Sequence, residues 1–218
     1  MSEMAQDPTR AGSEPPDWAG EVMQLSQSEI TALATKAARG AGLSWGEAEE
    51  AGWACGWLAR AGLPAPAMLL RGLDAESSAS PLRAGIRLMD HAGLPEGPCA
   101  LPVTLQDVAE PLVLVPFLAR VAERMGAPVD LDLGSHTICL TGREPVPDLS
   151  ALRGICHRTG ARATISVSQS SRAAAPGRFD GRIERGVWQS LDALALLTTV
   201  PASEVSRQRA GAQSSDND

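Results

Sequence analysis

The sequence predicts one α+β domain that combines an N-terminal helical hairpin, a split β-α-β-β-α-β (ferredoxin-like) antiparallel sheet and a C-terminal helix. Residues 24–64 contain two helix start signals, each followed by a glycine stop. Within residues 111–169, apolar runs and alternating apolar and polar residues predict strands, separated by two stretches with helical spacing. At 218 residues the chain is long enough for one buried core with tails at both ends.

We place the folded domain at residues 24–207. The preceding residues 1–23 are rich in proline, glycine, serine and acidic side chains, and residues 208–218 form a polar, acidic tail. Segments of this composition cannot bury enough apolar surface to offset the entropy lost on ordering them. We therefore expect both ends of the chain to be disordered.

Composition and charge disfavour nucleic acids and membranes as partners. The formal net charge is −7 and the pI is about 5.0, which argues against an electrostatic footprint for nucleic acid or an anionic membrane. Aromatic residues make up only 3% of the chain and tyrosine is absent, so a platform for stacking bases is not expected. The longest apolar stretch, 112–121, is too short to span a bilayer.

The cysteine pattern and the N-terminus favour a cytoplasmic location. The first residues contain neither the basic region nor the apolar run of a secretory signal. The four cysteines are widely spaced in a chain of ordinary domain size, which is typical of reduced thiols rather than of a disulfide framework. We expect a cytoplasmic protein.

The helical hairpin has the clearest local signals. Ser26 and Ser44 each precede a glutamate by three residues, which is the spacing of a capping box. The first helix should end at Gly40 or Gly42, and the second near Ala61, just before Pro64. The sequence therefore predicts two helices joined by a tight glycine corner.

The second helix of this hairpin carries two stripes that repeat every four residues. The small residues of one stripe are Ala48, Gly52 and Gly56, and the large residues of the other are Trp45, Glu49, Trp53 and Trp57. Each glycine inside a helix costs about 1 kcal/mol against alanine, so a close neighbour must offset this loss. That neighbour is either another backbone of the same chain or a bound partner, and a tryptophan stripe is more often packing than a cofactor site.

The later elements follow from turn and burial patterns. Ser80 and Pro81 begin a helix that ends at Gly93. The continuous apolar run 112–115 predicts a strand that is covered on both faces. The other predicted elements are a helix over 117–125, alternating strands over 129–133, 138–141 and 163–168, a helix that begins at Asp148 and ends at Gly160, and a final helix over 184–197.

Two segments resemble a known protein family. They are KAARGAGLSWGEAEEAG at 36–52 and TTVPASEVSR at 198–207, together with the terminal DND at 216–218. They resemble an uncharacterised bacterial family, domain of unknown function 3726. The resemblance implies a cytoplasmic bacterial protein and directs attention to both ends of the chain, but it supplies no catalytic residues. Residues 209–213 keep the family's glycine- and alanine-rich tail only in part.

Cysteine, histidine and aspartate do not form a convincing metal site. The residue types suited to zinc are His136, Cys139, Cys156 and His157, but they lack the paired spacing of structural zinc ligands. Asp130 and Asp132 would share one strand face, either as a pair for hydrolysis or a hard cation, or as the charged face of a solvent-exposed strand. The second interpretation is favoured, and we expect neither a metal nor a cofactor.

Two functional hypotheses remain open. The first is a non-catalytic binding module or accessory subunit that uses the glycine and tryptophan face of helix 45–61 to hold a protein partner or a small anionic metabolite. The residues predicted to bind are Ser44, Trp45, Gly52, Trp53, Ser203, Glu204 and Arg207.

The second hypothesis is a small-molecule enzyme. Glu49 or Glu50 would supply acid–base chemistry beside an indole, and Arg207 would hold an anionic substrate. This hypothesis requires the hairpin to meet the 198–207 segment in space. Against it, glutamates in the first turns of a helix are also favoured by the helix dipole alone.

Overall fold

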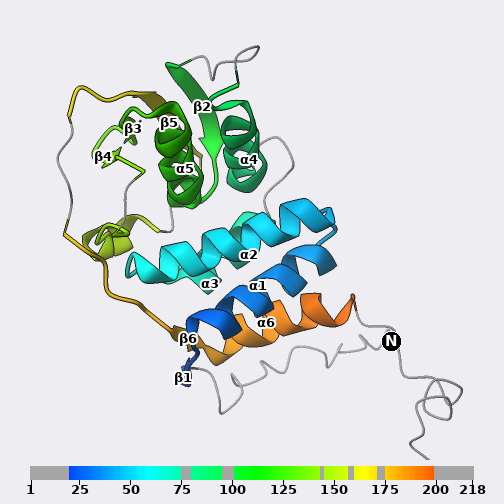
Figure 1. The fold of residues 1–218 in the computed structure, drawn as a ribbon. Helices are drawn as coiled ribbons and strands as arrows, with labels where there is room; N and C mark the ends of the chain where they lie inside the picture. Colours follow the sequence, from blue (N-terminus) through cyan, green and yellow to red (C-terminus); the bar gives the residue numbers. More distant parts are fainter. Residues whose placement is uncertain are drawn as a thin grey trace, which may run out of the picture.

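The computed structural model describes residues 20–74, 80–94, 101–142, 145–156, 160–170 and 175–198. Within these ranges the chain has the predicted mixed α+β architecture, with a group of helices on one side and a four-stranded antiparallel sheet on the other (Figure 1). No helix in this part of the chain is long and apolar enough to cross a membrane.

Both capping boxes of the predicted hairpin are present. Helix α1 spans Gln27–Gly40 and helix α2 spans Trp45–Arg60. The backbone N–H of Ser26 donates to Glu29 at 2.8 Å, and the backbone N–H of Ser44 donates to Glu47 at 2.8 Å. In each case the serine hydroxyl also accepts from the backbone N–H of the glutamate, so the helix starts are fixed by local sequence.

Further helices lie around the hairpin. They are α3 (Ala65–Leu73), α4 (Pro81–His91), α5 (Val115–Met125) and α6 (Arg185–Leu196). Helix α2 contacts α1, α3, α4 and α5, while α6 packs against α1. Figure 1 shows α1 between α2 and α6, and α4 and α5 above α2. The hairpin therefore meets the sheet side of the molecule through α4 and α5, and α5 in turn packs on the sheet.

The sheet is antiparallel throughout. Its strands are β2 (Val103–Val108), β3 (Val129–Asp132), β4 (Thr137–Leu140) and β5 (Ala161–Val167), in the order β2-β5-β3-β4. Leu131 pairs with Ile138 on one side and with Ile165 on the other, and all three side chains are buried. The alternation predicted for β3 and β4 is confirmed. In β5 it holds for Ala163 and Ile165, whereas Val167 is exposed and Ser168 is buried.

The strand predicted over 112–115 is wrong. Pro111–Leu114 form a 3₁₀ helix, η1, which leads directly into α5. All four residues are buried, and a fully buried segment is apolar on every side whether it is extended or helical. The first strand of the sheet is β2 instead, in a part of the chain for which no element was predicted.

The topology also departs from the predicted ferredoxin-like order. In a ferredoxin-like sheet the third strand lies between the first two, whereas here the last strand, β5, lies between β2 and β3. The second crossover is a 3₁₀ helix, η2 (Ser150–Ile155), in place of the expected α-helix. The antiparallel sheet is as expected, but its strand order differs.

The N-terminal boundary of the domain lies earlier than predicted. Strand β1 (Val22–Gln24) pairs antiparallel with β6 (Arg182–Glu184), immediately before α6. The strand thus begins inside the segment 1–23 that we expected to be disordered. Residues 1–19 and the tail 208–218 lie outside the described residues.

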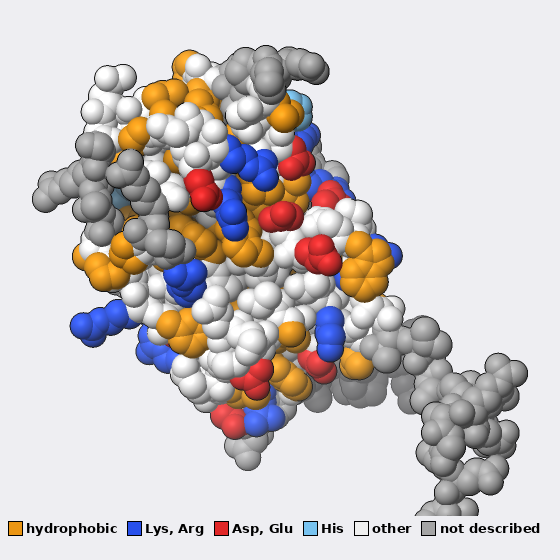
Figure 2. All heavy atoms as spheres, viewed as in Figure 1, with side chains coloured by type: hydrophobic (Ala, Val, Ile, Leu, Met, Phe, Trp, Pro, Cys, Tyr) orange, Lys and Arg blue, Asp and Glu red, His pale blue; other side chains and the backbone are white. Residues whose placement is uncertain are grey.

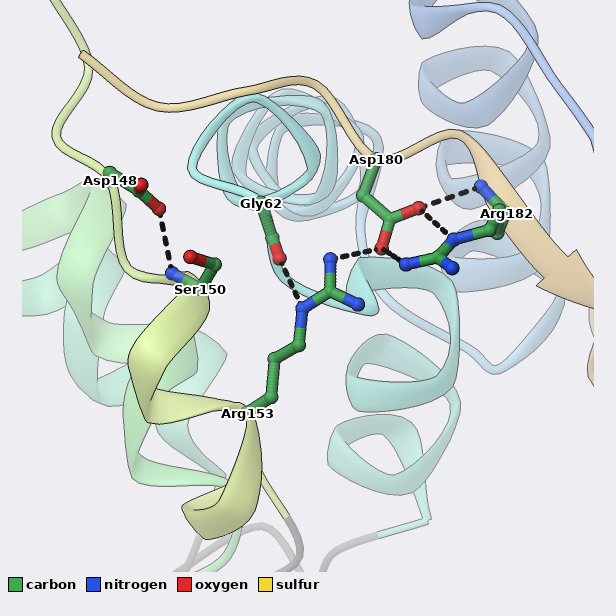
Figure 3. A network of polar contacts seen from close by, with 6 residues as sticks. All are labelled: Gly62, Asp148, Ser150, Arg153, Asp180 and Arg182. Atoms are coloured by element: carbon green, nitrogen blue, oxygen red, sulfur yellow. Dashed lines mark hydrogen bonds and ion pairs between the residues drawn. The ribbon is translucent and has the colours of Figure 1, made fainter.

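A charged network fastens the C-terminal end of α2 (Figure 3). Arg153 of η2 donates to the carbonyl oxygen of Gly62 at 2.8 Å and to Asp180 at 2.5 Å. Arg182 approaches the same carboxylate at 3.0 Å, and the backbone N–H of Asp180 donates to the carbonyl oxygen of Ala59 at 2.8 Å. The network joins η2, the end of α2 and the segment that leads into β6.

Candidate functional site

The glycine face of α2 is closed by α1. A Cβ atom built at Gly52 would lie 2.0 Å from the hydroxyl oxygen of Thr35 and 2.9 Å from the carbonyl oxygen of Thr31. At Gly56 it would lie 2.6 Å from the hydroxyl oxygen of Thr31. The two glycines thus admit the backbone and threonines of α1, and this packing offsets their low helix propensity. The predicted ligand groove at Gly52 is wrong because α1 fills it.

The tryptophan stripe passes from solvent into the core along α2. Trp45 is 66% exposed, and the Arg39 guanidinium lies over its ring at 5.3 Å. Trp53, two turns later, is half-buried, and Trp57 is buried. The middle of the stripe therefore lies at the boundary between core and solvent.

A cleft of about 300 Å³ opens at this boundary, between α2, α4 and α5. Its lining residues are Glu49, Glu50 and Trp53 from α2, Met89 from α4, and Arg120 and Arg124 from α5. Figure 2 shows acidic and basic side chains gathered on this face of the molecule, with hydrophobic side chains between them. Three predicted site residues, Glu49, Glu50 and Trp53, therefore meet around one cavity.

The floor of the cleft is an aromatic and cationic stack. The rings of Trp53 and Phe117 meet edge to face, with centroids 5.8 Å apart and planes at 69°. The Arg120 guanidinium lies 4.9 Å from the centre of the Trp53 ring, which is a cation–π distance. Because Phe117 is fully buried, it fixes the indole and, through it, the position of Arg120.

Each of the two arginines has a partner on α5 or α4, and among the described residues neither is hydrogen-bonded or ion-paired to α2. Arg120 forms an ion pair with Glu123, one turn later on α5, at 3.6 Å. Arg124 donates from Nη1 to the carbonyl oxygen of Met89, which ties α5 to the C-terminal turn of α4. Each guanidinium has five N–H donors, so these contacts leave donors for another group.

The Glu50 carboxyl sits in an unfavourable place for a charge. Its pKa is raised above the usual 4.5, first because partial burial removes water from the carboxylate, and also because Asp90 and Glu49 lie nearby. Arg120 and Arg124 act in the opposite direction but do not cancel the effect. A raised pKa at a cleft is a recognised mark of a functional carboxyl group.

Other predicted site residues have structural roles or lie outside the described part of the chain. Ser44 caps α2, as shown above, so its hydroxyl is already used. Trp45 lies one turn before Glu49 and outside the lining of the cleft. The remaining predicted residues, Ser203, Glu204 and Arg207, and therefore any contact between 198–207 and the hairpin, lie outside the described residues.

The arginines of the cleft were missed by the sequence interpretation. Arg120 and Arg124 are spaced i, i+4 on a helix whose other face is apolar, which predicts that they project together. No sequence signal, however, indicates that this exposed stripe faces α2, since 54 residues lie between the end of α2 and the start of α5. The pairing arises only from the way α5 packs on α2 through Phe117 and Trp53.

The described side chains that were considered as metal ligands lie on β3, on β4, in the turn between them and at the end of η2. Among the described residues, no three His, Cys, Asp or Glu side chains gather as metal ligands would. Cys139 is half-buried on β4 and Cys156 is buried at the end of η2, while His157 lies outside the described residues. Asp132 accepts a hydrogen bond from the backbone N–H of Gly134 at 2.8 Å, so it forms part of the turn after β3.

A buried ion pair outside the cleft was also missed. Glu110 is 1% exposed and accepts from Arg71 of α3 at 2.6 Å, and Arg71 also donates to the carbonyl oxygen of Cys156 at 2.8 Å. Glu110 has a left-handed backbone with φ of 50°, where non-glycine residues are uncommon. Because the pair connects α3 with η1 and η2, we assign it a structural role.

Comparison with known proteins finds a resemblance for part of the chain. The sequence model of a family described as "Protein of unknown function (DUF3726)" matches residues 25–96. No curated protein and no solved structure matches the chain. The matched region runs from the start of α1 to just beyond α4, so it includes the α2 and α4 sides of the cleft but not the arginines of α5. Residues 25–96 thus show the expected resemblance to this family of unknown function, while the segments 198–207 and 216–218 lie outside the match.

Proposed function

We propose that the protein is a binding module that holds a small anionic metabolite in the cleft between α2, α4 and α5. The observation that carries this proposal is the meeting of Glu49, Glu50 and Trp53 with Arg120 and Arg124 around one cavity of about 300 Å³. A volume at the lower end of the range for ligand pockets suits a metabolite rather than a large cofactor.

The arginines supply the anion-binding group. Guanidinium groups bind carboxylates and phosphates with two parallel hydrogen bonds, and a flat aromatic ring beneath one of them holds its orientation. Arg120 has this support from Trp53. The chain as a whole is acidic, with a net charge of −7, so attraction of an anion to the cleft has to come from these two arginines.

The proposal is tested by calorimetric titration with a panel of small carboxylates and phosphates. We expect at least one member to bind, and we expect Arg120→Met to weaken that binding by about tenfold or more through loss of one charged contact. Arg120→Met keeps an apolar side chain over Trp53. Arg87→Met is the matched control, because Arg87 is an exposed arginine of α4 outside the cleft.

Two results would count against the binding proposal. One is that no anion of the panel binds to the wild-type protein. The other is that Arg87→Met and Arg120→Met weaken binding equally, which would indicate a general effect of surface charge. Circular dichroism and chemical unfolding of each variant establish that it is folded before its affinity is compared.

The enzyme hypothesis remains as a second candidate because of Glu50. Burial raises the pKa of this carboxyl, which brings it toward the range in which a carboxyl group can exchange a proton near neutral pH. Under this hypothesis Glu50 is the acid–base residue. Arg120 and Arg124 hold the anionic substrate, which is the role that the sequence predicted for Arg207. An identified ligand is incubated with protein and followed by mass spectrometry. Turnover that Glu50→Gln abolishes while binding persists supports the enzyme, and an unchanged ligand supports the binding module.

A further inference from the structure

We infer that the ligand of the cleft is a zwitterion, namely an α-amino acid with an apolar side chain. Its carboxylate would contact Arg120 and Arg124, and its ammonium group would contact Glu49 and Glu50. This inference rests on the proposed binding function and names the chemical class of its ligand.

The first step is that opposite charges face each other across the cleft without pairing. Glu49 and Glu50 lie on α2, and Arg120 and Arg124 lie on α5. Among the described residues, neither of the two glutamates forms an ion pair with either arginine; Arg120 pairs with Glu123 of its own helix, and Arg124 bonds a backbone carbonyl of α4. Trp53 of α2 lines the same cleft, and the Arg120 guanidinium lies over its ring.

The second step is the charge balance of the lining. The two carboxylates and two guanidiniums of the lining sum to zero, and Asp90 and Glu123 add negative charge beside them. A ligand that carries an ammonium group as well as a carboxylate therefore complements the cleft better than a simple anion does. An anion bound at the arginines would still face Glu49 and Glu50, and it would leave the half-buried Glu50 carboxylate without a cation. An ammonium group on the same ligand supplies that cation.

The third step concerns the side chain of the ligand. Between the charged walls the lining consists of the Trp53 indole and the Met89 thioether, which are apolar. A charged side chain on the ligand would lose water on contact with these apolar groups without gaining a partner from them. A leucine- or methionine-sized molecule has both the neutral side chain and the small volume that a cavity of about 300 Å³ admits.

Calorimetric titration with a matched ligand series tests the inference. The series comprises L-leucine, L-methionine, 4-methylpentanoate, which is leucine without its ammonium group, and 3-methylbutylamine, which is leucine without its carboxylate. We expect one of the amino acids to bind at least about tenfold more tightly than either truncated analogue, since each analogue leaves one wall unpaired.

Single-residue variants assign each end of the ligand to its wall. Glu50→Gln should weaken amino-acid binding by about tenfold and leave 4-methylpentanoate unchanged or slightly tighter, whereas Arg120→Met should weaken both. Asp192→Asn on α6 is the control for loss of a negative charge, because Asp192 is remote from the cleft lining. Far-ultraviolet circular dichroism and urea unfolding confirm that each variant is folded.

The possible results separate this inference from the proposed function. If 4-methylpentanoate binds as tightly as leucine, or if only anions of the wider carboxylate and phosphate panel bind, the zwitterion is overturned while anion binding stands. If Glu50→Gln weakens 4-methylpentanoate as much as leucine, the assignment of the ammonium group to Glu50 is wrong. If neither the amino acids nor any anion of the panel binds, both the inference and the proposed function fail.

Discussion

The two faces of α2 show how one helix can be closed on one side and open on the other. Toward α1, the small residues Gly52 and Gly56 allow a neighbouring helix to approach until its threonines fill the space. Toward α4 and α5, the long side chains of Glu49 and Glu50 oppose arginines across a gap. Small residues remove space between helices, and large charged residues preserve it.

This difference separates stability from function along a single helix. The closed face gains packing contacts, which stabilise the fold even though glycine is a poor helix residue. The open face keeps a carboxyl group where water is partly excluded, which works against stability and is characteristic of binding and catalytic sites. Filling the closed face should therefore lower the free energy of unfolding. Removing the partly buried charge of the open face should raise it slightly.

The largest effect is expected on the closed face, for Gly52→Val. The added side chain would meet Thr35 and the backbone oxygen of Thr31, so α1 and α2 would have to separate. We expect the free energy of unfolding to fall by about 3 kcal/mol, as for other overpacked cores. Urea unfolding followed by circular dichroism measures the change.

Gly46→Val is the matched control for that substitution. Gly46 lies in the first turn of the same helix, and a Cβ atom there would meet nothing within 4 Å. We expect a change of less than about 0.5 kcal/mol. Equal effects at the two positions would mean that the contact with α1 does not explain the glycines.

The next effect is expected where the tryptophan stripe enters the core. Trp53→Ala removes the edge-to-face contact with Phe117 and the support beneath Arg120. We expect a loss of about 2 kcal/mol, less than for a fully buried tryptophan because Trp53 is half-buried. Trp45→Ala should change stability by less than about 0.5 kcal/mol, since Trp45 is 66% exposed. A larger loss of stability at Trp45 than at Trp53 would contradict the conclusion that the tryptophan stripe enters the core at Trp53.

A third effect is expected at the C-terminal end of α2, for Asp180→Asn. Burial favours the protonated form of Asp180, but hydrogen bonds from Arg182 and the charges of Arg153 and Arg182 outweigh it and hold the pKa below the usual 3.8. We expect a loss of about 1.5 kcal/mol at neutral pH from the weakened charged hydrogen bonds.

The pH dependence of this loss follows from the lowered pKa. A carboxyl whose pKa is lower in the folded state contributes its full stability above the unfolded pKa of 3.8 and loses it as the pH falls further. The difference between wild type and Asp180→Asn should therefore be constant near neutral pH and shrink below about pH 3.8. Urea unfolding over a pH series measures it. A difference that grows on acidification would contradict the assignment.

The smallest effect is expected for Glu50→Gln, and its sign is opposite. Because burial raises the pKa of Glu50 above 4.5, its ionised form is less stable in the folded protein than in the unfolded chain. We expect Glu50→Gln to stabilise the protein slightly at pH above the folded pKa, with the gain disappearing below about pH 4.5. Destabilisation by Glu50→Gln at neutral pH would show that Glu50 serves the fold.

Local sequence signals predicted the helices of the hairpin well. The capping boxes at Ser26 and Ser44 set the helix starts through contacts three residues apart, so no tertiary information is needed. The alternating strands over 129–133 and 138–141 were also predictable, because one face of the sheet is buried and the other is polar. These elements depend on neighbours in sequence or on a simple division between inside and outside.

Tertiary packing decided what the sequence left open. The run 112–115 is apolar on every side, and that pattern is shared by a buried strand and a buried helix. The glycine stripe indicated a close neighbour but did not identify it as Thr31 and Thr35 of α1. Likewise, the two glutamates of the cleft were predicted from α2 alone, whereas Arg120 and Arg124 reach them only through the packing of α5.

The most direct test of the division between the two faces is an NMR titration of the tryptophan side chains. Each of the five tryptophans gives one indole N–H signal, which is assigned by conservative replacement with phenylalanine. Adding L-leucine, or L-methionine if that binds more tightly in the calorimetric series, should move the Trp53 signal in proportion to occupancy and leave the buried Trp57 signal in place. Movement of Trp57 without Trp53, or no movement of any indole signal at saturating concentrations, would contradict the account.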